Sequence, residues 1–114
     1  MKVILIGAGC VAMLLTAPAW AQDPNAARNL SAPCFTCHGT DGRSVGGIPP
    51  SLAGQSTDYL VQQMKDFKGG KRPGTIMEQQ AKGYTDEQIE LMARYFSSLK
   101  PGQGTPAPGG RGAK

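Results

Sequence analysis

Hydrophobic residues recur with a helical period in two parts of this chain. Leu60, Val61, Met64 and Phe67 follow one another at spacings of one, three and three residues, which places them on one face of a helix. A second set has the same kind of spacing near the end of the chain: Ile89, Met92, Ala93, Phe96 and Leu99. No stretch alternates polar and apolar residues as a half-buried strand does. The pattern predicts an all-α fold.

Capping signals give the bounds of three helices. Asp23 as N-cap and Pro24 at the first helical position predict a short helix to about Ser31. The second helix begins at Ser56 or Thr57 and ends before two glycines, near residue 68. The last helix opens with a capping-box pattern at 85–88 and ends at the Pro-Gly pair of 101–102.

Glycine and proline dominate the stretches between these helices. Residues 39–50 and 71–83 show no apolar period, so we expect two long loops. Loops of this length are uncommon in so small a domain unless they wrap around something. Residues 101–114 are mostly Pro, Gly and Ala and predict a flexible tail, which leaves 22–100 as the folded domain.

The N-terminus has the layout of a secretory signal peptide. Lys2 precedes an apolar stretch, and Ala19 and Ala21 supply small residues at the positions that a leader peptidase reads. We expect cleavage after Ala21, so that residues 1–21 are lost and the mature protein is periplasmic. A membrane anchor is the alternative, but the apolar stretch is shorter than the roughly 20 residues of a spanning helix.

Composition narrows the class of protein. The chain has 114 residues, a net charge of +4 and 6% aromatic residues, and its 16 glycines and 9 prolines are many for a plain helical domain. One domain with a small core fits these values, whereas a multi-domain enzyme, a coiled coil or a polytopic membrane protein does not. The charge is too small to indicate nucleic-acid binding by itself.

Cys34-Phe35-Thr36-Cys37-His38 is a C-x-x-C-H motif, the attachment site of a c-type haem. Two thiols three positions apart on a helical turn project to the same side, where each can bond one vinyl group of the porphyrin. The imidazole of His38 is then held beneath the iron. The motif predicts one haem c, attached through Cys34 and Cys37, with His38 as an iron ligand.

Other chemistry for the motif has less support in the sequence. A thioredoxin-like C-x-x-C pair needs strands around it, and none is predicted. A zinc site usually has four Cys or His ligands, but signal cleavage leaves two cysteines and one histidine. A disulfide between Cys34 and Cys37 would close only a small, strained ring.

The second axial ligand of the iron must be a residue other than histidine, because His38 is the only one. Met64 and Met92 lie on the apolar faces of predicted helices and are interpreted as core residues. Met77 lies in the second predicted loop, off both apolar faces, and is the candidate ligand. The alternative is that Met77 is an exposed loop residue and the iron has five ligands. Pro49 and Pro50 stiffen the first loop, where a carbonyl can accept the other ring N–H of His38.

Four features in order resemble a class I cytochrome c: residues 34–38, 50–55 and 59–72, and Met77 ahead of the last helix. The resemblance covers about residues 25–100. It implies three to four helices wrapped around one covalently bound haem, the Pro50 carbonyl accepting from His38, and Met77 as the distal ligand. The family helix usually continues into the motif, and Pro33 departs from that pattern.

Shorter segments resemble two narrower groups of cytochromes. The segment around residues 52–60 resembles the c4/c553 branch of bacterial carriers, and residues 75–77 and 81–86 resemble the cytochrome subunit of flavocytochrome c sulfide dehydrogenase. The second likeness implies single-electron transfer with a flavoprotein partner. A free electron shuttle to a respiratory or photosynthetic partner is the alternative, and a five-coordinate haem sensor or small peroxidase is the third hypothesis. No catalytic carboxylate pair, Ser-His-Asp set or phosphate loop is evident, so we do not expect the chain alone to be an enzyme.

Overall fold

The computed structural model of the chain describes residues 23 and 25–103, which contain helices and turns and no strand. The elements in order are α1 (Ala26–Ser31), the 3₁₀ helix η2 (Ala32–Cys34), α2 (Phe35–His38), the 3₁₀ helix η3 (Thr40–Gly42), α3 (Thr57–Lys68), α4 (Thr75–Lys82) and α5 (Asp86–Ser98). The prediction of an all-α fold is confirmed.

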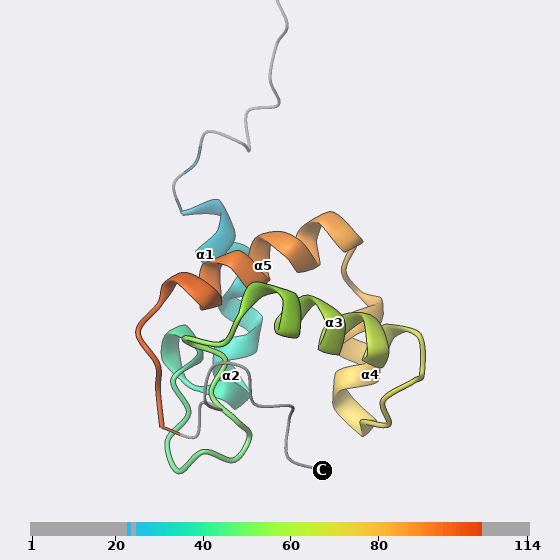
Figure 1. Cartoon of the computed structure of the whole chain (residues 1–114), viewed down its shortest axis with the longest axis horizontal. Coiled ribbons are helices and arrows are strands. Elements are labelled where there is room, and N and C mark those ends of the chain that lie inside the picture. Colours follow the sequence, from blue (N-terminus) through green and yellow to red (C-terminus); the bar gives the residue numbers. More distant parts are fainter. Residues whose placement is uncertain (1–22, 24, 104–114) are drawn as a thin grey trace, which may run out of the picture.

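Helix α5 is the centre of the arrangement. It packs against α1 on one side and along α3 on the other, and α4 packs against α3 (Figure 1). The buried core lies where α3 meets α5 and consists of five side chains: Leu60, Ile89, Met92, Ala93 and Phe96. All five are among the residues that the helical period placed on the two inner faces.

The two longer predicted helices form close to their expected bounds. The Ser56 side chain accepts a hydrogen bond from the backbone N–H of Tyr59 at the start of α3. Thr85 and Gln88 form the expected capping box at the start of α5, each side chain bonding the other's backbone. Helix α5 ends at Ser98, somewhat before the predicted stop.

Helix α1 begins later than predicted. Its N-cap is Asn25, whereas the sequence pattern favoured Asp23; the carboxylate of Asp23 accepts from the N–H of Asn25 in a local turn. The predicted first helical residue, Pro24, lies outside the described residues. Helix α1 ends at Ser31, two residues before Pro33. The chain then continues through η2 into α2, so helical turns lead up to the motif, in the tighter 3₁₀ form over Ala32–Cys34.

The expectation of a loop over 71–83 is wrong for most of its length, because Thr75–Lys82 is α4. The flanking Pro73, Gly74 and Gly83 suggested a loop, whereas they stand just outside the helix. Within α4, Met77 and Ala81 are four residues apart and partly or fully buried. The Glu78 carboxylate accepts from the N–H of Gly74, which satisfies one free donor at the helix start.

The first predicted loop is held by backbone hydrogen bonds. The carbonyl of Gly42 accepts from Leu52 at 2.8 Å and from Ala53 at 3.1 Å, and Gly54 donates to the carbonyl of Phe96 on α5 at 2.9 Å. These bonds fix the segment between α2 and α3 against the C-terminal helix. The Ser51 hydroxyl donates to the carbonyl of Gln103, so the first residues after α5 also contact this loop.

The predicted signal peptide and its cleavage after Ala21 lie outside the described residues, as do residues 104–114 of the predicted tail. None of the helices in 25–103 has the length and apolar character needed to cross a membrane.

Asp41 joins three elements. Its carboxylate accepts from the Tyr95 hydroxyl of α5 at 2.5 Å and from the Arg28 side chain of α1 at 2.9 Å. The backbone of Asp41 has φ 54°, a conformation that Asp and Asn tolerate better than most residues. The Tyr95 hydrogen bond, and then the Arg28 contact, hold the pKa of Asp41 below its usual value.

Asp41→Asn is expected to lower the free energy of unfolding by about 1–2 kcal/mol at pH 7, because the charged acceptor is lost while the backbone shape is kept. Because folding lowers the pKa of Asp41, its contribution to stability is complete above the unfolded pKa of about 3.9. That contribution is lost as the pH falls through the folded-state pKa. Urea unfolding should therefore show the difference at pH 7 and a smaller one below about pH 4. Tyr95→Phe is the control, since it should cost less in the Asp41→Asn background than alone; equal costs at every pH would contradict this role.

Candidate functional site

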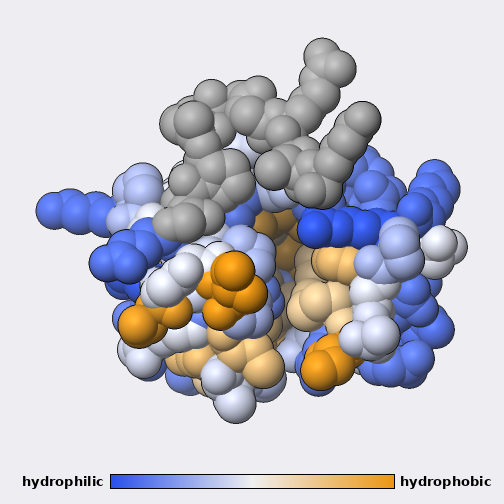
Figure 2. All heavy atoms as spheres, turned by 90° about the horizontal axis from the view of Figure 1, so that it is seen from below, coloured by the Kyte–Doolittle hydropathy of each residue, from blue (hydrophilic) through white to orange (hydrophobic). Residues whose placement is uncertain are grey.

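A cavity of about 360 Å³ opens between α2, the loop after it, α3, α4 and α5. Figure 2 shows it as a hollow with hydrophobic side chains on its floor. The described lining is mainly apolar and aromatic, including Leu52, Tyr59, Leu60, Phe67, Ile76, Tyr84, Ile89 and Phe96. Such a site suits a large apolar ligand.

The predicted motif residues meet at this cavity. Cys34, Cys37 and His38 all line it. Cys34 is the last residue of η2 and the N-cap of α2, and α2 carries Cys37 and His38. Neither cysteine is in a disulfide. Burial raises the pKa of the Cys34 thiol, and the nearby Cys37 adds to this effect, so the group is a neutral thiol at pH 7.

Pro50 lies where the resemblance implied. Its carbonyl oxygen is 2.7 Å from Nδ1 of His38, and the imidazole is buried, with 8% of its surface exposed. A carbonyl can only accept, so Nδ1 is the nitrogen that donates this hydrogen bond. The bond orients the ring and leaves Nε2 as the nitrogen that can bind a metal ion.

All three methionines of the described chain line the cavity: Met64 on α3, Met77 on α4 and Met92 on α5. Met77 lies on α4 and not in a loop, so the reason for preferring it from the sequence pattern does not hold. Packing separates the three instead. Met92 belongs to the core cluster and Met64 packs against it, whereas Met77 is in neither group. The thioether of Met77 is the one that the core does not use.

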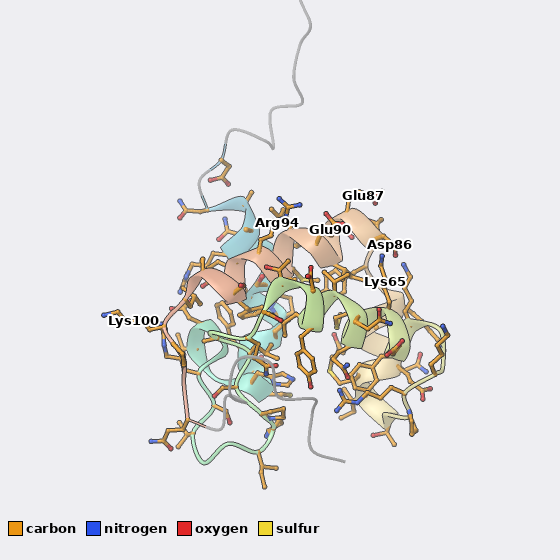
Figure 3. The ribbon with its side chains drawn as sticks, in the orientation of Figure 1. Lys65, Asp86, Glu87, Glu90, Arg94 and Lys100 are labelled. Atoms are coloured by element: carbon orange, nitrogen blue, oxygen red, sulfur yellow. The ribbon has the colours of Figure 1, made fainter. Side chains whose placement is uncertain are left out.

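Five basic residues lie on α3, on α4 or in the segment between them: Lys65, Lys68, Lys71, Arg72 and Lys82. Lys65 reaches Asp86 at the start of α5 with an N–O distance of 3.9 Å (Figure 3). Lys68 reaches the same carboxylate at 3.2 Å. Of the five, Arg72 lines the cavity.

Sequence reasoning missed three exposed apolar residues, two of which lie at or beside the cavity lining. Val45, Ile48 and Ile76 are 92, 89 and 63% exposed. Ile76 lines the cavity, and Ile48 precedes Pro49, which does so too. Figure 2 shows strongly hydrophobic side chains on both sides of the hollow. The available signal in the sequence was Ile48, an apolar residue that lies among glycines and prolines and belongs to no helical face.

These groups fit a covalently attached haem. Two thiols and an imidazole whose Nε2 can bind a metal ion lie within residues 34–38, and a mainly apolar cavity opens beside them. The alternative zinc site gains no support, because the described residues hold no group of three or more His, Cys, Asp and Glu side chains placed around a metal ion.

Comparison with known proteins agrees with this geometry. The family model described as cytochrome c matches residues 25–100. The cytochrome subunit of sulfide dehydrogenase from Chlorobaculum tepidum is 50% identical over 70 residues, which are 61% of this chain and 63% of that protein. Cytochrome c-554(548) of Halomonas halodenitrificans is 40% identical over 81 residues, 68% of this chain and 98% of the relative.

Cytochrome c4 of Azotobacter vinelandii is 36% identical over 97 residues, 77% of this chain and 46% of the relative. The chain therefore spans less than two thirds of the sulfide dehydrogenase subunit and about half of cytochrome c4. The family match and the C-x-x-C-H turn at the cavity concern the same part of the chain. The chain belongs to the cytochrome c family, as a class I cytochrome with covalently attached haem c.

Proposed function

We propose that this protein is a periplasmic carrier of single electrons, with His38 and Met77 as the two axial ligands, and that it serves as the cytochrome subunit of a flavoprotein that oxidises sulfide. The observation that supports this partner is the 50% identity to a sulfide dehydrogenase cytochrome subunit. The resemblance of residues 75–77 and 81–86 to such a subunit supports the same assignment.

Bound haem supplies an iron that cycles between the ferrous and ferric states. The protein's part is to keep the surroundings of the iron unchanged during that cycle. The Pro50 carbonyl holds the Nδ1 proton of His38 and so fixes the direction of Nε2. A neutral thioether from Met77 as the second ligand favours the ferrous state and raises the reduction potential.

The rim of the cavity suits a brief protein contact. Exposed Ile48 and Ile76 offer apolar area close to the cavity, and redox encounters typically bury less than about 1,200 Å². The acidic side chains of Asp86, Glu87 and Glu90 lie along α5 (Figure 3), on the side away from the hollow shown in Figure 2. A partner can approach the opening without meeting this acidic row.

Export rests on the sequence pattern of residues 1–21. A free electron shuttle of the c4/c553 type is the second candidate, and the matches to cytochrome c4 and to cytochrome c-554(548) favour it. The two candidates share the haem site and differ in whether a flavoprotein stays bound.

Gel filtration of native periplasmic extract, followed by haem and flavin absorbance together, separates them. We expect haem and flavin to elute together, well above the size of this chain, with sulfide reducing the haem in that fraction. Haem eluting alone near the monomer size would contradict the subunit assignment and favour the shuttle.

A further inference from the structure

The residues that follow α5 pack closely on the loop between α2 and α3. We call residues 101–103 the C-terminal strap. A Cβ on Gly54 would be 2.6 Å from Cγ of Pro101, and a Cβ on Gly102 would be 2.9 Å from Oγ of Ser51. Figure 1 shows this segment descending from α5 toward the loop. At both glycines the strap and the loop approach too closely for a side chain to fit between them.

Ser51 is the loop residue that the strap holds. It is completely buried, with 0% of its surface exposed. Its hydroxyl donates to the backbone carbonyl of Gln103 in the strap and accepts from the backbone N–H of Ser44 at 2.9 Å. Its own backbone carbonyl accepts from the side-chain amide of Gln55. Hydrogen bonds from three separate positions in the chain therefore fix this one residue.

Ser51 directly follows Pro50, whose carbonyl accepts from Nδ1 of His38 at 2.7 Å. The peptide unit between Pro50 and Ser51 is planar, so the direction of that carbonyl is tied to the backbone position of Ser51. Proline has no backbone N–H with which to anchor itself. The side-chain and backbone hydrogen bonds of Ser51 are therefore in a position to fix the acceptor of His38.

We propose that Ser51, held by the C-terminal strap, is a positioning residue for the iron ligand His38: it fixes the direction of the Pro50 carbonyl and thereby affects the reduction potential of the haem. The inference rests on the part of the proposed function that makes His38 an axial ligand. Neither Met77 nor the flavoprotein partner enters it. Through these contacts the end of the described chain acts on an iron ligand near its start.

Loosening this anchor changes how strongly His38 stabilises ferric iron. A well-directed hydrogen bond from Nδ1 makes Nε2 a more basic ligand, and a more basic nitrogen favours the more highly charged ferric state. A carbonyl that is free to turn makes a weaker hydrogen bond, because the strength of the bond depends on its angle. The ferrous state then gains, and the ring proton on Nδ1 exchanges faster with water.

Ser51→Ala in the haem-loaded protein is expected to shift the equilibrium toward ferrous iron about two- to fivefold at pH 7, a rise of roughly 18–41 mV at 59 mV per tenfold for one electron. In the ferrous protein, the proton NMR signal of the His38 Nδ1–H should move upfield and exchange faster with water. Gly102→Ala should act in the same direction, because the added methyl displaces the strap while Ser51 keeps its hydroxyl. Gln103→Ala should change neither quantity, since its backbone carbonyl remains.

Ser31→Ala is the matched control. Ser31 is also 0% exposed, and its hydroxyl donates to the carbonyl of Ala27 at 2.8 Å within α1. Loss of either hydroxyl should lower the free energy of unfolding, but only Ser51→Ala should move the potential and the Nδ1–H signal. Equal potential shifts in the two variants, or wild-type Nδ1–H exchange in Ser51→Ala, would overturn the proposal. A wild-type protein whose His38 ring protons lack the large upfield shift of an axial ligand would instead overturn the ligation by His38, and this inference with it.

Discussion

Met77→Ala is expected to abolish the far-red absorption band of sulfur-bound ferric iron and to lower the reduction potential by more than about 100 mV, within the ~0.8 V that axial ligands span. Loss of the thioether removes a ligand that favours ferrous iron. The ferrous variant should then bind carbon monoxide, because one axial position is open. Absorption spectra, redox titration and carbon monoxide binding measure these three effects.

The other cavity methionines provide the control for this experiment. Met64 and Met92 line the same cavity but pack in or against the core. Met64→Leu and Met92→Leu keep volume and apolar character, so each should retain the band and cost less than about 1.5 kcal/mol of stability. If Met64→Leu lost the band while Met77→Ala kept it, the ligand would be on α3. If no variant changed the spectrum, the five-coordinate hypothesis would stand.

Local signals predicted the parts of the fold that depend on neighbouring residues. The Thr85 and Gln88 capping box and the apolar period of α3 are each contained within one element, and both formed as expected. Helix α4 was missed because its eight residues are too few for a clear period and because proline and glycine flank it. Its inner face is defined by α3, which packs against it.

The same distinction holds for the site. The C-x-x-C-H turn is contiguous, so its chemistry can be read from five residues. The contact between His38 and Pro50 spans twelve residues, and only the resemblance implied it. Arg72 lines the cavity and lies over the Phe67 ring, whereas Lys65 and Lys68 reach Asp86. No local sequence signal distinguishes these basic residues, because tertiary packing separates them.

Gly39→Ala is expected to lower the free energy of unfolding of the haem-loaded protein by more than about 3 kcal/mol. Gly39 has φ 81° and ψ 160°, a region that is essentially restricted to glycine and costs other residues about 1–3 kcal/mol. A Cβ there would also be 2.0 Å from the carbonyl oxygen of Arg43, which is backbone and cannot rotate away. Urea unfolding followed by haem absorbance measures the loss.

Gly46→Ala separates conformational strain from the clash. Gly46 also has φ 81°, but a Cβ there would meet nothing within 4 Å, so its cost should be only the 1–2 kcal/mol or so of a left-handed residue. Gly39 directly follows His38, and the displaced Arg43 backbone belongs to the loop that leads to Pro50. Gly39→Ala should therefore also disturb the His38–Pro50 hydrogen bond and change the potential, while Gly46→Ala should not. Equal losses of stability in the two variants would show that the close approach to Arg43 does not matter. An unchanged reduction potential in Gly39→Ala would show that His38 is held independently of this turn.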